Sequence, residues 1–427
     1  MDTTPFHLIL FALDIAVLGG LFLWLQFRRG TKTTHSAIYN FEKSLFAPST
    51  IIRQPTLTWD VAGVFIFGGF GLVCFAVLSR FIRTGFAQNN IYNFNVGQCI
   101  VEGILVHGTV FCIGTAVLLY RCRRKILAVL SACCALFLVI VGFDMLYWEP
   151  YHLRVVRYEI KTSKIKKSLR IVFVSDIQTD RIGFHEINTL KKIQQQKADL
   201  IILGGDYLQS FQGTREKHLP EKFRQMLLDY PLEAPLGVYA IAGNNGMGND
   251  ADLFKDTGTP SDTRGVQYIR NTVLFSDLGC DKGWDPPIDL ILLSLVQSAG
   301  GLGERGITES GNFIVMAGHF PNYAVDGYKT SKDEVLSGYR KADRAPDLML
   351  AGHTHGGQVV LPFYGPATIW ADQHSQQIPR SMWSGIFPYP NGGHALITRG
   401  SGMERGWAPR VRFFCPAEIC VIDIVPE

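Results

Sequence analysis

The chain has 427 residues, of which 47% are hydrophobic and 18% are charged, and its formal net charge is +4. This composition is too apolar for a disordered protein and too poor in charge for a nucleic-acid-binding arm, so we expect no nucleic-acid partner. Residues 1–150 hold 11 Lys/Arg against 7 Asp/Glu, so the whole positive excess lies in the first third of the chain.

The first 150 residues are predicted to form a membrane domain. A spanning helix needs about 20 mostly apolar residues, and four runs meet this requirement, at residues 6–27, 61–81, 98–120 and 126–147. Aromatic residues that favour the headgroup layer stand at the ends of these runs: Trp24, Trp59, Tyr120, Tyr147 and Trp148. We therefore expect an N-terminal four-helix transmembrane domain over residues 1–150 and a soluble domain over 151–427.

Basic residues in the loops predict the orientation. The segments 28–58 and 121–125 carry nine Lys/Arg, whereas the opposite side carries Arg80 and Arg83. Since cytoplasmic loops are enriched in Lys and Arg, both termini and the soluble domain are expected outside the cytoplasm. The basic residues between 154 and 167 argue against this orientation, although long domains translocate largely regardless of charge.

After Pro150 the pattern changes to short β-branched runs that predict buried strands. The expected strands cover residues 171–174, 200–203, 238–241, 290–295, 313–316 and 348–350, and a helix is expected over 185–197. Later runs at 358–361, 394–398 and 419–425 are expected to add antiparallel strands to the sheets. This order predicts a layered α/β core.

Polar residues follow five of the predicted strands. They form the blocks Asp176-Ile177-Gln178, Gly205-Asp206, Gly243-Asn244-Asn245, Gly318-His319 and Gly352-His353-Thr354-His355. Because α/β folds bind ligands at the carboxyl ends of their strands, we expect the five blocks to converge on one site. A carboxylate that bridges two metals about 3.5–4 Å apart, with oxygen and nitrogen ligands on each side, is a hydrolytic arrangement that this set can supply.

The order of the blocks resembles the calcineurin-like metallophosphoesterases, whose pattern is D-x-H, G-D, G-N-H, H and G-H-x-H. The resemblance runs from Leu169 to the C-terminus, and the stretch GHTHGGQ at 352–358 is its most specific part. The stretch Thr398-Arg399-Gly400-Ser401-Gly402, which leads to Pro416-Ala417-Glu418-Ile419, looks like the membrane-anchored bacterial branch of the family. The resemblance implies a two-sheet β-sandwich flanked by helices and a location in the bacterial cytoplasmic (inner) membrane.

The family pattern also implies a set of ligands for two divalent metal ions. One metal would be held by Asp176, Gln178, Asp206 and His355, and the other by Asp206, Asn244, His319 and His353. Asp206 would bridge the pair. Two metals in this arrangement polarise phosphoryl oxygens and activate water near neutral pH, so the implied activity is hydrolysis without a covalent intermediate.

Two positions depart from the family pattern. Gln178 stands where the family has a histidine ligand, and its neutral amide oxygen favours manganese or magnesium over zinc, so we expect manganese. Asn245 stands where the family has the histidine that contacts phosphate, and an amide can donate a hydrogen bond there but cannot transfer a proton. Loss of the acid favours a phosphoanhydride over an alkyl phosphodiester. The UDP-diacylglucosamine hydrolases of the same superfamily also lack this histidine.

We therefore expect a multi-pass membrane hydrolase of phosphoesters or phosphoanhydrides, with the bilayer and a lipid-linked pyrophosphate as partners. A first alternative is a catalytically weakened phosphate- or metal-binding module with a membrane or signalling role, suggested by Gln178 and Asn245. A second alternative is a transporter, suggested by the ionisable residues Asp14, Glu102 and His107 in the apolar runs. The sequence leaves the oligomeric state open.

Overall fold

A computed structural model of the chain describes 11 stretches and three single residues. They are residues 101, 103–121, 123–209, 218–245, 250–259, 262–283, 287–300, 311–325, 346–367, 378–389, 393–404 and 409–427, with Val17 and Gly20. The chain forms two compact units, Met1–Asp144 and Met145–Glu427.

The described part of the first unit is helical. A π-helical turn, η1 (Gly103–His107), leads into α5 (Gly108–Arg121), and α6 (Lys125–Phe143) follows. Two stretches are long and apolar enough to cross a membrane, Ile104–Arg121 with mean hydropathy 1.6 and Lys125–Tyr151 with mean hydropathy 2.9. They correspond to the predicted runs 98–120 and 126–147. Apart from Val17 and Gly20, the predicted runs 6–27 and 61–81 lie outside the described residues.

Two six-stranded sheets form the centre of the second unit, as far as the chain is described. The first sheet has the order β1-β14-β2-β3-β4-β5, with β1 at Arg154–Thr162, β14 at Glu418–Pro426, β2 at Leu169–Val174, β3 at Leu200–Leu203, β4 at Val238–Ile241 and β5 at Val266–Ile269. The second has the order β12-β13-β9-β8-β7-β6, with β12 at Gly385–Pro388, β13 at His394–Ile397, β9 at Leu348–Ala351, β8 at Phe313–Gly318, β7 at Ile288–Leu292 and β6 at Val273–Leu278.

Short elements complete this unit. The chain enters it through a π-helical turn, η2 (Asp144–Trp148), and α7 (Glu149–Tyr151). A separate hairpin joins β10 (Val360–Leu361) to β11 (Gly365–Pro366). The helices are α8 (Phe184–Gln195), α9 (Leu219–Asp229), α10 (Leu295–Gly300) and α11 (Asn322–Val325), and the 3-10 turns are η3 (Asp250–Leu253), η4 (Cys280–Lys282), η7 (His355–Gly357) and η9 (Arg380–Met382).

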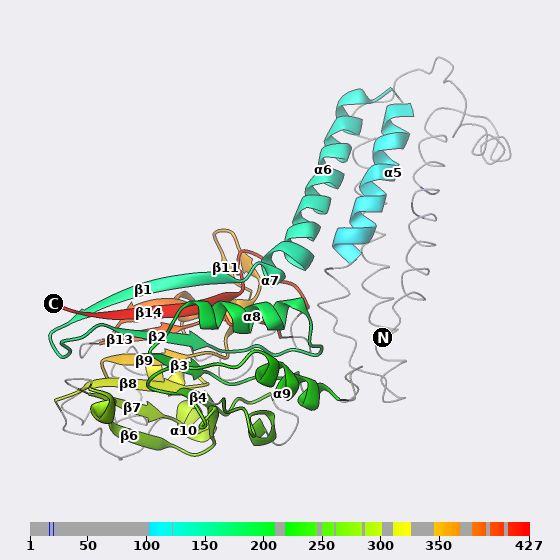
Figure 1. Cartoon of the computed structure of the whole chain (residues 1–427). Coiled ribbons are helices and arrows are strands. Elements are labelled where there is room, and N and C mark those ends of the chain that lie inside the picture. The colour runs from blue at the N-terminus through cyan, green and yellow to red at the C-terminus, as the bar shows by residue number, and fades with distance from the viewer. Residues whose placement is uncertain are drawn as a thin grey trace, which may run out of the picture. The chain divides into compact units, whose positions relative to one another are not determined.

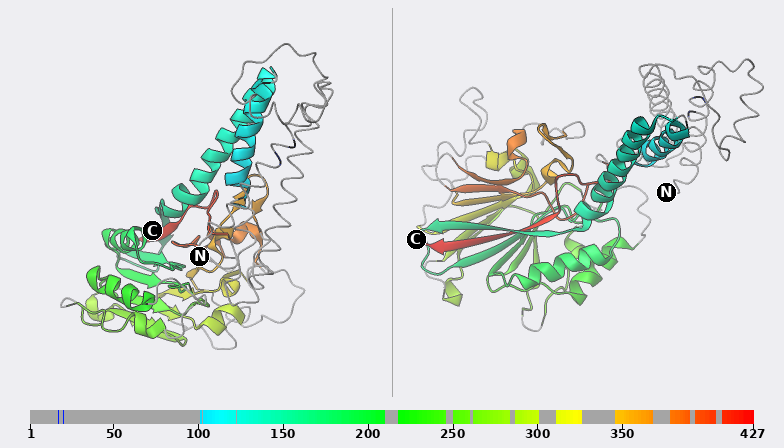
Figure 2. Two further views of the ribbon diagram at one scale, coloured as in Figure 1. Left: turned by 90° about the vertical axis from the view of Figure 1, so that its right-hand side faces the viewer. Right: turned by 90° about the horizontal axis from the view of Figure 1, so that it is seen from above.

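Side chains that alternate between the two faces of a strand produce two layers of apolar core. On β2, Ile171 and Phe173 point into the apolar core between the two sheets, whereas Val172 and Val174 belong to the core beneath α8 and α9. This period of two is the geometry of a strand whose faces are both buried. Consequently α8 and α9 lie on the outer face of the first sheet, as Figure 1 and the view from above in Figure 2 show.

The expected core strands are present, but three predictions about the strands need correction. β13 runs antiparallel to β12 and parallel to β9, and β14 runs antiparallel to β2 and parallel to β1, so the antiparallel prediction holds for one neighbour of each. The run 290–295 ends as a strand at Leu292, because Ser294 turns the chain into α10 and accepts the Gln297 N–H at 3.3 Å. The run 358–361 joins neither six-stranded sheet: it contributes to the separate hairpin and to an isolated parallel bridge between Val359 and Phe413.

Candidate metal centre

The five predicted blocks follow strands whose carboxyl ends meet. β2, β3 and β4 are parallel neighbours in the first sheet, and β8 and β9 are parallel neighbours in the second. Backbone hydrogen bonds join the blocks directly: Asp176 N–H donates to Gly205 O at 3.0 Å, and Gly352 N–H donates to His319 O at 3.0 Å. The arrangement follows the rule that open α/β sheets place ligands beyond the carboxyl ends of their strands.

Five of the predicted site residues share a rare backbone conformation. Their φ angles are positive: Asp176 56°, Gln178 38°, Asp206 54°, His353 71° and His355 49°. Such a conformation costs a non-glycine residue on the order of 1–3 kcal/mol and persists where the surrounding structure enforces it. Positive φ angles at five residues of one cluster are typical of a functional site.

Glycines allow the blocks to approach one another closely. A Cβ on Gly243 would lie 2.1 Å from both the backbone nitrogen and Oδ1 of Asp206. A Cβ on Gly352 would lie 2.1 Å from Ser175 Oγ and 2.5 Å from Asp176 Oδ2. These contacts explain why glycine precedes the ligand residues in the G-N and G-H blocks.

The four residues expected to hold the second metal lie within contact of one another. Asn244 Oδ1 lies 2.7 Å from His319 Nε2 and 3.0 Å from His353 Nδ1, and Asp206 Oδ2 lies 3.4 Å from His319 Nε2. One potential ligand atom from each of Asp206, His319 and His353 lies within 4.8 Å of the other two. The prediction that these residues converge therefore agrees with the geometry.

Opposite charges in this group shift the pKa values of His319 and Asp206. Burial disfavours the charged imidazole, but the Asp206 carboxylate outweighs burial and raises the pKa of His319 to about 9. Burial would raise the pKa of Asp206, but His319 and the Asn245 N–H together lower it. Both ring nitrogens of His319 face oxygen atoms, Gly204 O at 2.8 Å and Asn244 Oδ1 at 2.7 Å, as expected for an imidazolium.

The residues expected to hold the first metal leave two polar atoms without a partner. Gln178 Oε1 and His355 Nδ1 are buried and have no hydrogen-bond partner in the described part of the chain. A buried acceptor left unmatched costs about 1–3 kcal/mol. His355 Nε2 lies 3.6 Å from Asp176 Oδ1. A cation bound at Gln178 Oε1 would satisfy that unmatched oxygen, and a set of carboxylate, amide and imidazole donors fits a divalent metal ion.

Glu404 is a site residue that the sequence did not predict. Its Oε2 accepts hydrogen bonds from Gln178 Nε2 at 2.5 Å and from Asn245 Nδ2 at 3.2 Å. The only sequence signal was its place two residues beyond the family-like stretch that ends at Gly402.

Both amide hydrogens of Asn245 point at carboxylates. Nδ2 lies 3.2 Å from Glu404 Oε2 and 3.4 Å from Asp206 Oδ2, and the backbone N–H donates to Asp206 Oδ1 at 2.7 Å. Asn245 must release one of the two side-chain contacts before it can donate to a phosphoryl oxygen. The longer bond, to the expected bridging carboxylate Asp206, is the one that a metal would displace.

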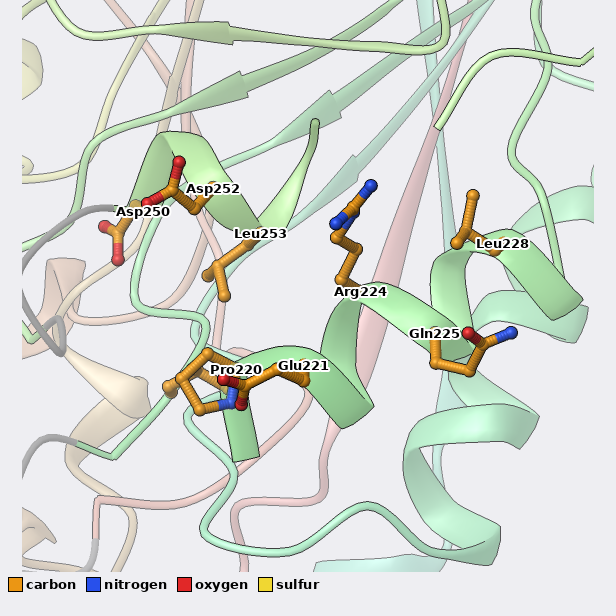
Figure 3. Close-up of a pocket in the computed structure, with 9 residues that line it drawn as sticks. Pro220, Glu221, Arg224, Gln225, Leu228, Asp250, Asp252 and Leu253 are labelled. Atoms are coloured by element: carbon orange, nitrogen blue, oxygen red, sulfur yellow. The ribbon is translucent and has the colours of Figure 1, made fainter. Parts of the chain in front are cut away.

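A cavity of about 550 Å³ lies between α9 and η3 and begins at Leu208, two residues beyond Asp206 (Figure 3). Its polar lining includes Glu221, Asp250 and Asp252, and the Arg224 guanidinium pairs with Asp256 at 3.0 Å. This excess of carboxylates disfavours a phosphate, so we do not place the reacting group there. Burial and the nearby Asp206 charge raise the pKa of Asp250 to about 6.

Comparison with known proteins agrees with this site. The Calcineurin-like phosphoesterase family model matches residues 169–357, which include all seven predicted ligands. This part of the chain is similar to the calcineurin-like metallophosphoesterases. Its expected resemblance to this family is therefore confirmed, and the mixed sheets and flanking helices of the second unit fit the α/β fold of that family.

Curated relatives of the metallophosphoesterase domain come from several bacteria. The metallophosphoesterase YkuE of Bacillus subtilis is 26% identical over 290 residues, which cover 65% of this chain and 87% of the relative. A metallophosphoesterase of Aquifex aeolicus is 22% identical over 293 residues, covering 65% and 93%. The UDP-2,3-diacylglucosamine pyrophosphatase LpxG of Chlamydia trachomatis is 24% identical over 311 residues, covering 65% and 91%. Members of the family are hydrolases, and their fold implies bound divalent metal ions.

Proposed function

We propose that the protein is a dinuclear metal-dependent hydrolase of lipid-linked phosphoesters or phosphoanhydrides. The observation that supports a metal enzyme best is the pair of buried, unmatched atoms, Gln178 Oε1 and His355 Nδ1, beside the cluster around Asp206. Asp176, Gln178, Asp206 and His355 would hold one metal, and Asp206, Asn244, His319 and His353 would hold the other. The metals would supply Lewis-acid polarisation of phosphate and an activated water. With an amide oxygen in place of imidazole, manganese is the expected metal.

The way the chain enters the metallophosphoesterase domain supports action at a membrane. The apolar stretch Lys125–Tyr151 ends inside the second unit, where Met145 O accepts the Arg412 N–H at 3.1 Å and Glu149 Oε2 accepts the Cys415 N–H at 2.8 Å. The segment 412–415, which precedes β14, is thus hydrogen-bonded to the end of a candidate membrane helix.

Exposed aromatic side chains gather on that part of the domain. We call Leu361, Phe363, Tyr364 and Phe414 the aromatic edge. The side chain of Phe363 is fully exposed, and that of Phe414 is 60% exposed. The hairpin is tied to the Phe414 segment, because Val360 N–H donates to Phe413 O at 2.8 Å. Aromatic rings favour the membrane interface. This edge therefore supports a substrate taken from the bilayer surface.

The proposed leaving group follows from Asn245. An amide cannot protonate a departing alkoxide at neutral pH, so a phosphate or phosphomonoester leaving group of low pKa suits the site. The relative LpxG carries the name of a pyrophosphatase of a diacylated sugar nucleotide, which favours a lipid-linked pyrophosphate as the class. We retain the multi-pass topology in the bacterial inner membrane, with the domain outside the cytoplasm, as part of the proposal.

The test is hydrolysis of bis(p-nitrophenyl) phosphate by the full chain in detergent micelles, with and without manganese. The nitrophenolate leaves without an acid, so Asn245 should not prevent turnover. We expect metal-dependent activity that Asp206→Asn abolishes, because the substitution removes the charge of the bridging ligand. A folded wild-type chain that binds manganese yet turns over no faster than Asp206→Asn would contradict the proposal and favour the weakened binding module.

A further inference from the structure

The two amide side chains that depart from the family pattern share one partner. Gln178 Nε2 and Asn245 Nδ2 both donate to the same oxygen of Glu404, at 2.5 Å and 3.2 Å. The Gln178 side chain is fully buried, and Glu404 is 226 residues away in the sequence. Convergence of both substituted positions on one carboxylate indicates that the three residues act as a group.

The backbone of Glu404 is held by one side chain of the GHTHGGQ loop. The Glu404 N–H donates to Gln358 Oε1 at 2.8 Å, and Gln358 Nε2 donates to Glu404 O at 3.1 Å. Gln358 is 1% exposed and adopts a positive φ of 58°. Another hydrogen bond holds the backbone two residues earlier, where Gly402 N–H donates to Asp176 O at 2.8 Å. The carboxylate is therefore presented from a fixed backbone.

The hydrogen bond to Glu404 decides which end of the Gln178 amide can meet a cation. A carboxamide has a donor end and an acceptor end of nearly equal shape, and only its oxygen can bind a metal. With Nε2 bonded to Glu404, Oε1 is the end left unmatched in the buried site. A carboxylate behind a ligand also raises the ligand's basicity and fixes its orientation, as it does for metal-bound histidines.

We propose that Glu404 is a positioning residue that makes a metal ligand of Gln178, by holding the amide nitrogen and turning the amide oxygen toward the first metal. This inference rests on the proposed function. It explains how a glutamine can replace the family histidine at this position: the carboxylate supplies the orientation and basicity that an unassisted amide lacks.

A double-mutant cycle on the full chain in detergent micelles tests this role. Metal-stripped wild type, Glu404→Gln, Gln178→Ala and the double variant are dialysed against manganese, and bound metal per chain is counted across a concentration series. Glu404→Gln should weaken one of two manganese sites by roughly 10- to 100-fold, the range for residues behind a ligand, and leave the other unchanged. The electron paramagnetic resonance signal of a coupled manganese pair should then appear only at higher manganese concentration.

The coupling between the two substitutions shows whether Glu404 acts through Gln178. If Glu404 acts through Gln178, Glu404→Gln should add little to Gln178→Ala, because the side chain to be oriented is gone. Losses that multiply in the double variant would overturn the inference in favour of a direct metal ligand, and an unchanged affinity in Glu404→Gln would overturn it outright. The matched control is Glu159→Gln, an exposed position on β1 that should bind as wild type does.

Controls separate this inference from the proposed function. A wild-type chain that binds no manganese would defeat both, whereas two manganese ions in wild type and in Glu404→Gln would defeat the inference and leave the metal enzyme standing. Thermal unfolding of the metal-free variants checks folding, since Glu404→Gln keeps the side-chain shape and should unfold within a few degrees of wild type. A loss of manganese with an unchanged melting temperature supports the positioning role.

Discussion

His319 Nε2 lies 3.4 Å from Asp206 Oδ2 with both side chains buried, so the metal-free site stores a proton where the second metal is expected. Because a histidine ligand must be deprotonated, binding should displace this proton. The pKa of His319 is raised to about 9, so apparent manganese affinity should rise with pH until about 9 and then level off. Calorimetry in buffers of different ionisation enthalpy should show proton release at pH 7, and affinity independent of pH between 6 and 8 would contradict it.

The Asn245 position should respond to restoring an acid. Asn245→His should raise hydrolysis of an alkyl phosphodiester by about 10-fold or more, since general acids typically contribute 10²–10⁴-fold. The same change should alter bis(p-nitrophenyl) phosphate turnover far less, because nitrophenolate leaves unaided. The ratio of the two rates is the measurement. Asn245→Ala is the matched control and should raise neither rate; equal gains on both substrates would argue against an acid role.

Gly243 should not tolerate a methyl group. A Cβ there would lie 2.1 Å from Asp206 Oδ1, so Gly243→Ala must displace the expected bridging ligand. Overpacking of this kind costs about 1–3 kcal/mol. Thermal unfolding and bound manganese should both fall. Gly311→Ala is the control, since a Cβ at Gly311 meets nothing within 4 Å of the described structure. Equal behaviour of the two variants would refute the close approach of the blocks.

Asp250 should make the metal-free protein less stable at higher pH. Its pKa is raised from 3.8 to about 6 by burial and by Asp206, so folding favours its neutral form. The penalty is absent below pH 4 and grows as pH rises through 6. Asp250→Asn should therefore unfold at a higher temperature than wild type at pH 7.5, with the difference shrinking toward pH 4. A difference that does not change with pH would show that charge is not the cause.

The aromatic edge should matter for membrane substrates only. Phe363→Ser with Tyr364→Ser should slow hydrolysis of a long-chain phospholipid anhydride in vesicles and leave bis(p-nitrophenyl) phosphate turnover unchanged, because the edge lies outside the ligand cluster. Val296→Ser, a 79% exposed apolar residue on α10, is the control and should slow neither reaction. If the edge variant loses both activities equally, its effect is structural rather than interfacial.

Local sequence was sufficient for the parts of the site that depend on strand ends. The apolar runs at 171–174 and 200–203 became β2 and β3, and the polar blocks that follow them, Asp176 to Gln178 and Asp206, could be assigned to one edge. The reason is physical: a strand's face alternation and the residue that ends it are written within a few positions. The polar blocks could therefore be placed at one edge from local sequence, whereas the seven expected ligands within them were named through the resemblance to the family.

Contacts between distant segments could not be read in the same way. Glu404 accepts a hydrogen bond from Gln178, which is 226 residues away in the sequence. The backbone of Glu404 is held in space by Gln358 rather than by any local pattern. Likewise β13 lies parallel to β9 and antiparallel to β12, a choice that depends on which edge of the sheet is free. Sequence by itself determined which strand ends carry polar residues; tertiary packing decided which end of the Gln178 amide is left unmatched, because that depends on Glu404, a partner brought by the fold.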